Sequence, residues 1–113
     1  IVSRPALYAL RLAPLVGLAS YYARRFHGRT QANGERHDQG RLTAASRIGD
    51  FGDTLIVTRI DNGVSVRVVV SDRFGKDDPP DRTVDLSRSA AKRLGILRIG
   101  ITKVRVQVLA KAK

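Results

Sequence analysis

The chain has 113 residues, of which 42% are hydrophobic, so it can form one domain with a single core. It has no cysteine, which excludes disulfides and thiolate chemistry. All ten acidic residues lie between Glu35 and Asp85, so the net charge of +11 is concentrated at the two ends. This distribution predicts attraction to a polyanion, which includes nucleic acid, anionic lipid and anionic cell-wall polymer.

The first part of the chain lacks a membrane-spanning pattern. Residues 1–16 are apolar but interrupted by arginine and proline, which is typical of a linker or a short surface helix. We expect an N-terminal linker or extension over residues 1–16, a barrel domain over 17–110 and a basic tail over 111–113. Residues 17–22 are a candidate strand, and residues 24–41 are polar with a turn at Asn33-Gly34.

A β-hairpin is the strongest local prediction. Residues 54–60 and 64–70 are rich in β-branched side chains and are separated by a short segment that contains Asn62-Gly63. Asn-Gly between two such runs favours a type I′ turn, in which both central residues have positive φ. The valines at 64, 66, 68 and 70 share one face of the second strand.

The rest of the chain predicts a loop, a helix and a last strand. Residues 74–82 contain two consecutive prolines and form a loop. A short helix then begins at the N-cap Ser87 and ends at Gly95. Residues 102–109 alternate between polar and apolar, as a half-buried strand does. Five or six short strands and a small helix indicate a mainly β protein built as a closed barrel.

Motifs for phosphate or metal binding are missing. Glycine-rich phosphate loops are absent, and the only two histidines, His27 and His37, are ten residues apart with no HExxH motif. We therefore expect no metal and no other cofactor. No nucleic-acid partner is expected either, because the basic C-terminal part lacks aromatic side chains for base stacking. We expect Arg98, Lys103 and Arg105 to form the solvated face of a strand.

Three carboxylates stand out by position. Glu35 follows the Asn33-Gly34 turn and is expected on a loop. Asp72 directly follows an apolar strand, where a barrel places either a salt-bridged acid or an acid in a cleft. Asp85 precedes the helix and is assigned a structural role, accepting hydrogen bonds from the first-turn amides.

Several short blocks in order resemble the rare lipoprotein A (RlpA-like) family over about residues 17–109. The blocks are Ala19-Ser20-Tyr21-Tyr22, Gly34-Glu35, Asn62-Gly63, Asp72-Arg73 and Asp85-Leu86-Ser87. The resemblance implies a six-stranded double-psi β-barrel with one or two short helices. It also implies an exported protein of the bacterial periplasm or cell envelope that acts on peptidoglycan.

Some members of that family are lytic transglycosylases, which cut glycan strands without water and leave a 1,6-anhydro sugar. Such a reaction needs an acid for the leaving oxygen and a base for the C6 hydroxyl. The family's acidic positions fall on Asp72, the expected acid/base, and on Glu35, the expected supporting residue. Candidate substrate-binding residues are Tyr21, Tyr22, His37 and Arg73.

One position departs from the family pattern. Relatives carry histidine where this chain has Ser46, and serine does not titrate near neutral pH. His37 occupies a position that relatives fill with Phe or Tyr, and it is a candidate substitute for the missing histidine or a surface loop histidine. The segment after Arg73 also differs, which predicts a reshaped cleft wall beside Asp72.

Two functions therefore stay open. The first is a lytic transglycosylase that cleaves between MurNAc and GlcNAc, and the second is a glycan-binding module that has lost catalysis. A DNA-associated barrel is a third, remote alternative. We expect peptidoglycan glycan strands as the partner, a monomer, and a membrane anchor only through sequence upstream of Ile1.

Overall fold

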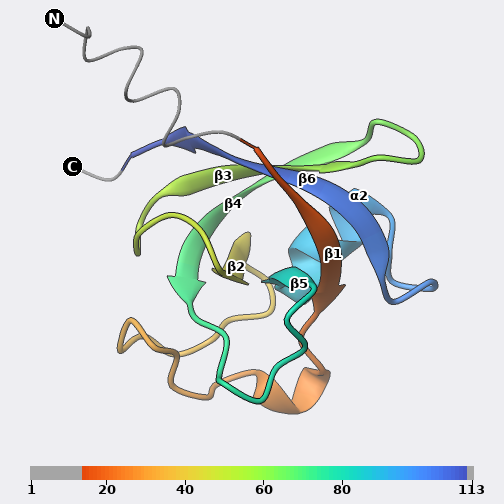
Figure 1. Ribbon diagram of the computed structural model, residues 1–113. Coiled ribbons are helices and arrows are strands. Elements are labelled where there is room, and N and C mark those ends of the chain that lie inside the picture. Colours follow the sequence, from red (N-terminus) through yellow and green to blue (C-terminus); the bar gives the residue numbers. More distant parts are fainter. Residues whose placement is uncertain (1–13, 112–113) are drawn as a thin grey trace, which may run out of the picture.

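The computed structural model describes residues 14–111, which form one closed barrel of six strands (Figure 1). The strands are β1 (Leu15–Tyr21), β2 (Thr43–Ser46), β3 (Thr54–Arg59), β4 (Ser65–Asp72), β5 (Arg82–Leu86) and β6 (Thr102–Ala110). A 3-10 turn, η1 (Arg24–Phe26), follows β1, and the helix α2 (Arg88–Leu94) follows β5. The described residues include no helix that is long and apolar enough to cross a membrane.

The barrel closes in the strand order β1-β5-β2-β4-β3-β6. Two of its pairs, β1 with β5 and β2 with β4, are parallel, and the other four are antiparallel. These parallel pairs join segments that are distant in the sequence, with the hairpin β3–β4 and strand β6 completing the wall. The prediction of a mainly β, six-stranded double-psi barrel is confirmed.

Alternating side chains of the long strands fill the barrel. On β4, residues 66, 68 and 70 are valines that are at most 5% exposed, while those between them point outward. Strand β6 repeats the pattern with buried valines at 104, 106 and 108. Apolar surface is thereby removed from water on one face of each strand, which is the main stabilising contribution to such a core.

Helix α2 closes one side of this core. Its residues Ala90, Ala91 and Leu94 are fully buried. Ser87 is the N-cap, with its Oγ accepting a 3.2 Å hydrogen bond from the amide of Ala90, and Gly95 ends the helix with φ of 80°. Both predicted helix ends are therefore confirmed.

The hairpin is confirmed, but its predicted turn type is wrong. Among the described residues only glycines have positive φ, so Asn62 does not adopt the conformation that a type I′ turn requires. The connection is longer than two residues, because Arg59 N donates to the carbonyl of Val64 across it. In a connection of this length only Gly63, with φ of 73°, needs the left-handed region, and Asn62 Oδ1 instead accepts from Val64 N.

Three further details differ from expectation. The first strand covers residues 15–21 rather than 17–22. Residues 43–46, which carry no β-branched run, form the short central strand β2. Arg98 precedes β6 in a turn, while Lys103 and Arg105 do lie on the exposed face of β6.

The expected linker at residues 1–16 lies almost wholly outside the described residues, and the division of the chain into linker, barrel and tail stays a prediction.

Candidate functional site

A cavity of about 330 Å³ lies where the loop after β1 meets the loop between β4 and β5. Figure 1 shows these loops together at one end of the barrel, in orange and teal. The cavity is lined by polar and aromatic side chains, among them Tyr22, His37, Asp72, Asp78 and Asp85. It therefore combines acids with rings, which suits binding of a sugar chain.

Strand β2 brings two of these acids together. Ala45 pairs with Asp72 of β4 on one side and with Asp85 of β5 on the other. Each neighbour is one strand spacing away, so the two backbones are about 10 Å apart. Ala45 also lines the cavity, and its small side chain leaves space between the two carboxyls.

Asp72 accepts three hydrogen bonds. The hydroxyl of Tyr22 donates to Oδ2 at 2.5 Å, while the amides of Ala32 and Arg73 donate to Oδ1 at 2.8 Å and 2.9 Å. All three partners are donors, so both carboxyl oxygens of Asp72 act as acceptors. These donors also hold the side chain in one orientation.

Asp85 has a different environment. Burial raises the pKa of Asp85 to about 6, and the nearby charges of Asp78 and Asp72 also raise this pKa. A hydrogen bond from Ser20 Oγ to Oδ1, at 3.0 Å, and the positive charge of Arg82 act in the opposite direction. Asp85 therefore holds its proton closer to neutral pH than an ordinary aspartate does. The expected hydrogen bonds from the first turn of the helix are not made, because Ser87 occupies the capping position.

Ser20 connects Asp85 to a cation. Arg82 Nη1 donates to Ser20 Oγ at 2.7 Å, and the Ser20 hydroxyl donates to Asp85.

We expect Ser20→Ala to raise the pKa of Asp85 further, by about one unit, because the carboxylate loses a donor that stabilises its charge. A ¹³C NMR titration of the Asp85 carboxyl measures this shift. Ser65→Ala, at an exposed position on β4, is the control. An unchanged or lowered pKa in Ser20→Ala would contradict the assigned role of the hydroxyl.

Tyr22 contacts both Asp72 and His37. Burial, and then the hydrogen bond to Asp72 and its charge, raise the pKa of the Tyr22 phenol above its ordinary value. The hydroxyl therefore stays protonated and donates to Asp72. The ring of His37 stacks on the ring of Tyr22, with centroids 4.4 Å apart and an interplanar angle of 20°.

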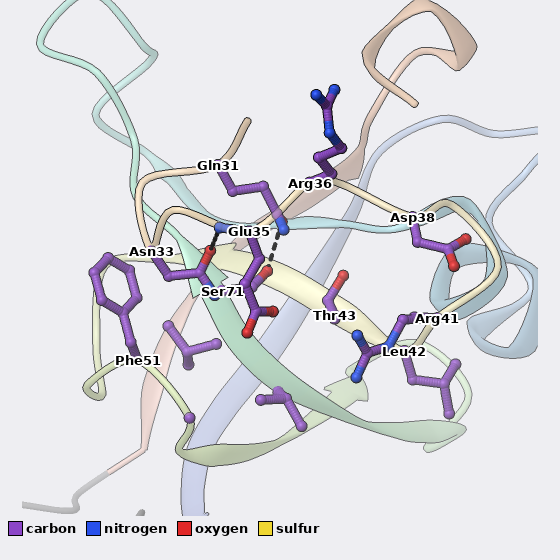
Figure 2. A pocket seen from close by; sticks show the side chains of 13 residues that line it. Gln31, Asn33, Glu35, Arg36, Asp38, Arg41, Leu42, Thr43, Phe51 and Ser71 are labelled. Atoms are coloured by element: carbon purple, nitrogen blue, oxygen red, sulfur yellow. Dashed lines mark hydrogen bonds between the residues drawn. The ribbon is translucent and has the colours of Figure 1, made fainter. Parts of the chain in front are cut away.

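Glu35 lies in a second cavity, of about 510 Å³, rather than with Asp72. Figure 2 shows the side chains of Glu35 and Arg41 pointing into this cavity, while Arg36 points away. Asn33 Oδ1 accepts from Glu35 N at 3.0 Å and holds the turn that presents the carboxylate. The structure thus separates the two acids that the sequence analysis paired.

Gln31 and Arg73 lie on the boundary between the two cavities. Gln31 lines both, and its Oε1 accepts a 2.7 Å hydrogen bond from the hydroxyl of Ser71. Arg73 lines the first cavity and places its guanidinium 4.7 Å from the ring centre of Phe51, which lines the second. The cavities are therefore neighbours along one face, separated by a buried amide and a cation-ring contact.

Two predicted positions lie outside both cavities. Ser46 is fully buried, and its Oγ donates to the carbonyl of Ile48 at 2.8 Å and accepts from the Ile48 amide at 3.1 Å. Tyr21 packs against the core and donates its hydroxyl to the carbonyl of Leu97 at 2.6 Å. Both side chains are thus occupied by contacts within the barrel.

Asp85, expected to have only a structural role, and Asp78, which no expectation covered, both line the first cavity. Asp85 follows two buried strand residues, Thr83 and Val84, which is a weaker form of the signal that drew attention to Asp72 at the end of its apolar strand. Asp78 lies in a proline-containing loop, and no local pattern marks it. Within residues 14–111, no three His, Asp or Glu side chains converge as metal ligands.

The chain is similar in sequence to proteins of one bacterial family. The profile of the family described as lytic transglycolase matches residues 15–106. Endolytic peptidoglycan transglycosylase RlpA of Pseudomonas aeruginosa is 43% identical over 93 residues, which are 82% of this chain and 27% of that protein. The RlpA protein of Vibrio cholerae, of the same description, is 38% identical over 97 residues, 86% of this chain and 36% of that protein. The chain therefore spans about a third or less of the curated relatives that it matches.

Two solved structures share the fold. The Streptomyces papain inhibitor superposes with a TM-score of 0.65 at 22% identity, over 85% of this chain and 94% of that one. An expansin from Clavibacter michiganensis superposes with a TM-score of 0.63 at 23% identity, over 88% of this chain and 52% of that one. At this level of identity the likeness concerns the barrel alone.

Proposed function

Since the chain belongs to the lytic transglycolase family, we propose that it cleaves peptidoglycan glycan strands between N-acetylmuramic acid and N-acetylglucosamine, leaving 1,6-anhydro ends. The observation that carries this proposal is the pair of carboxyls on either side of Ala45, one with a raised pKa and one held by three donors. The substrate would place the protein in the bacterial cell envelope, after export. A monomer is sufficient, because all the residues invoked come from one chain.

Asp85 supplies the proton in this reaction. Its pKa of about 6 keeps part of the population protonated near neutral pH, as a general acid requires. The proton passes to the glycosidic oxygen as the bond from that oxygen to the anomeric carbon breaks. The leaving sugar departs with a new hydroxyl, and Asp85 becomes a carboxylate.

Asp72 receives the second proton. The C6 hydroxyl of the N-acetylmuramic acid attacks its own anomeric carbon, and Asp72 takes the hydroxyl proton as the new C–O bond forms. The bond from Tyr22 keeps the carboxylate oriented for this step. The two roles that the sequence analysis assigned to Asp72 are thereby divided between two carboxyls.

Glu35 acts at a distance from the bond that breaks. With Arg41 and the exposed ring of Phe51 it forms the second cavity, which can bind a further part of the same glycan strand. A sugar ring packing on an aromatic side chain while its hydroxyls bond to charged groups is typical of such a subsite. Glu35 is thus a supporting residue through binding.

The test is product analysis on peptide-free glycan strands. The wild-type protein is expected to produce 1,6-anhydro-N-acetylmuramic ends, detected by mass spectrometry, and Asp72→Asn is expected to lower their rate of formation at least a hundredfold. Asp77→Asn, which changes an exposed acid of the same loop outside both cavities, is the matched control. Wild-type rates in Asp72→Asn would remove Asp72 from the reaction.

A glycan-binding module is the second candidate function. The observation in its favour is Ser46, which places a hydroxyl bonded to Ile48 where active relatives are expected to carry an imidazole. Retention of the wild-type protein on purified sacculi, with no anhydro product from sacculi or stripped strands, would support this alternative over the enzyme.

A further inference from the structure

His37 is a buried side chain with unused hydrogen-bonding capacity. It is 3% exposed, so the expectation of a surface loop histidine is wrong, and it lines the cavity that contains Asp72 and Asp85. Within the part of the chain that the structure describes, neither Nδ1 nor Nε2 has a hydrogen-bond partner. Buried polar groups of folded proteins are nearly always paired, so this ring is an exception that needs an explanation.

The loop around His37 holds the ring rigidly. Its backbone amide donates to the carbonyl of Arg29 at 2.7 Å, and its carbonyl accepts from the amide of Gly28 at 2.7 Å. The ring itself stacks on Tyr22, which is in turn fixed by its bond to Asp72. The imidazole is therefore oriented before any ligand arrives, and no backbone group competes for its nitrogens.

The environment of the His37 imidazole favours its neutral form near pH 7. Burial lowers the pKa of His37, and the nearby His27 lowers it further, while Asp72 and Asp38 act in the opposite direction. A neutral imidazole offers one N–H donor and one lone pair. The ligand group that matches both is a hydroxyl, which donates and accepts at once and which a glycan carries on every sugar.

We propose that His37 is a substrate-binding residue whose imidazole forms a hydrogen bond with a sugar hydroxyl of the glycan strand bound between Asp72 and Asp85. This inference rests on the proposed function for the identity of the substrate. It assigns to His37 a binding role that serves both the enzyme and the binding-module alternative.

Two substitutions separate binding from structure. His37→Phe keeps a ring to stack on Tyr22 but removes both nitrogens, and His37→Gln restores a donor and an acceptor. On peptide-free glycan strands we expect His37→Phe to raise KM about tenfold with a smaller change in kcat, and His37→Gln to recover part of the loss. Arg67→Gln, at an exposed position of β4 outside both cavities, is the control, and we expect its kcat/KM to stay within about twofold of wild type.

Thermal unfolding distinguishes a binding role from a purely structural one. If His37 only stabilised the fold, its replacement by Phe would lower Tm. Since His37→Phe removes two unpaired buried nitrogens, its Tm should equal or exceed that of the wild type, by up to several degrees. Weaker substrate binding without loss of Tm supports the proposal. An unchanged kcat/KM in His37→Phe, or a loss that follows a lowered Tm and is not recovered by His37→Gln, overturns it.

A direct binding measurement keeps this test separate from the enzyme assay. If the wild-type protein yields no anhydro ends, the proposed reaction fails, but the affinity of the same strands is still measurable by calorimetry. About tenfold weaker binding by His37→Phe than by wild type would then support the role of His37. Equal affinities would overturn it.

Discussion

Asp85→Asn is expected to lower kcat on peptide-free glycan strands about a thousandfold, because an amide cannot protonate the leaving oxygen. The substitution is nearly isosteric, and the amide oxygen can still accept the hydrogen bond from Ser20. KM should change little, since the carboxyl acts mainly in the transition state. Steady-state kinetics with quantified anhydro ends measure both constants.

The pH dependence identifies Asp85 as the acid. Wild-type kcat should fall as the pH rises above about 6, because the acid then loses its proton. In Asp85→Asn the residual rate should not show this fall. A thousandfold loss with an unchanged pH profile would contradict the assignment, as would wild-type activity in the variant.

Stability measurements test whether unfolding could cause that loss. Because the folded protein holds the Asp85 proton up to about pH 6 and the unfolded chain releases it near pH 4, the folded state binds more protons between these values. The wild-type free energy of unfolding therefore falls as the pH rises from about 4 to 6. Asp85→Asn lacks this fall, so it should be more stable at pH 7, by about 2 kcal/mol after allowance for partial exposure, and equal at pH 3. Urea denaturation at both pH values provides the measurement.

Gly17→Ala should destabilise the barrel by about 3 kcal/mol, which is the largest expected effect on folding. A Cβ at Gly17 would lie 2.2 Å from Thr83 Cγ2 and 3.1 Å from the carbonyl oxygen of Asp81. This is the place where β1 pairs in parallel with β5 and the register shifts beside Leu18. The two backbones approach closely there, and the amide of Leu18 donates to the carbonyl of Asp81 at 3.1 Å.

Thr83→Ser tests the cause of this effect. It removes Cγ2 but keeps the hydroxyl, which donates to the carbonyl of Leu18 at 3.1 Å. In the Thr83→Ser background, Gly17→Ala should therefore destabilise by roughly half as much, because the close contacts with the Asp81 carbonyl oxygen and with Cβ of residue 83 remain. Urea denaturation of the four proteins gives the coupling, and Gly75→Ala, whose Cβ would meet no atom closer than 3.6 Å, is the control. Additive effects of the two substitutions would refute the steric explanation.

The candidate site was only partly visible in the sequence. Asp72 and Arg73 were marked by their place at the end of an apolar strand, and the family resemblance singled out Tyr22 and Glu35. The separation of Glu35 from Asp72 was not visible in the sequence. It depends on how Gln31, in the same loop as Glu35, packs against Ser71. The resemblance likewise drew attention to Ser46 as a substituted position, but its bonds to Ile48 and its burial come from the path of the loop after β2.

Local patterns in the chain determined the elements of this protein, and tertiary packing determined its site. The valine alternation of β4 and β6, the N-cap at Ser87 and the C-terminal glycine at Gly95 follow from contacts within a few residues, so the sequence alone predicts them. The adjacency of Asp72 and Asp85 to Ala45 depends on a parallel and an antiparallel pairing of strands distant in the sequence. The raised pKa of Asp85 and the unpaired nitrogens of His37 depend in turn on which groups these pairings bury, and burial is a property of the whole fold.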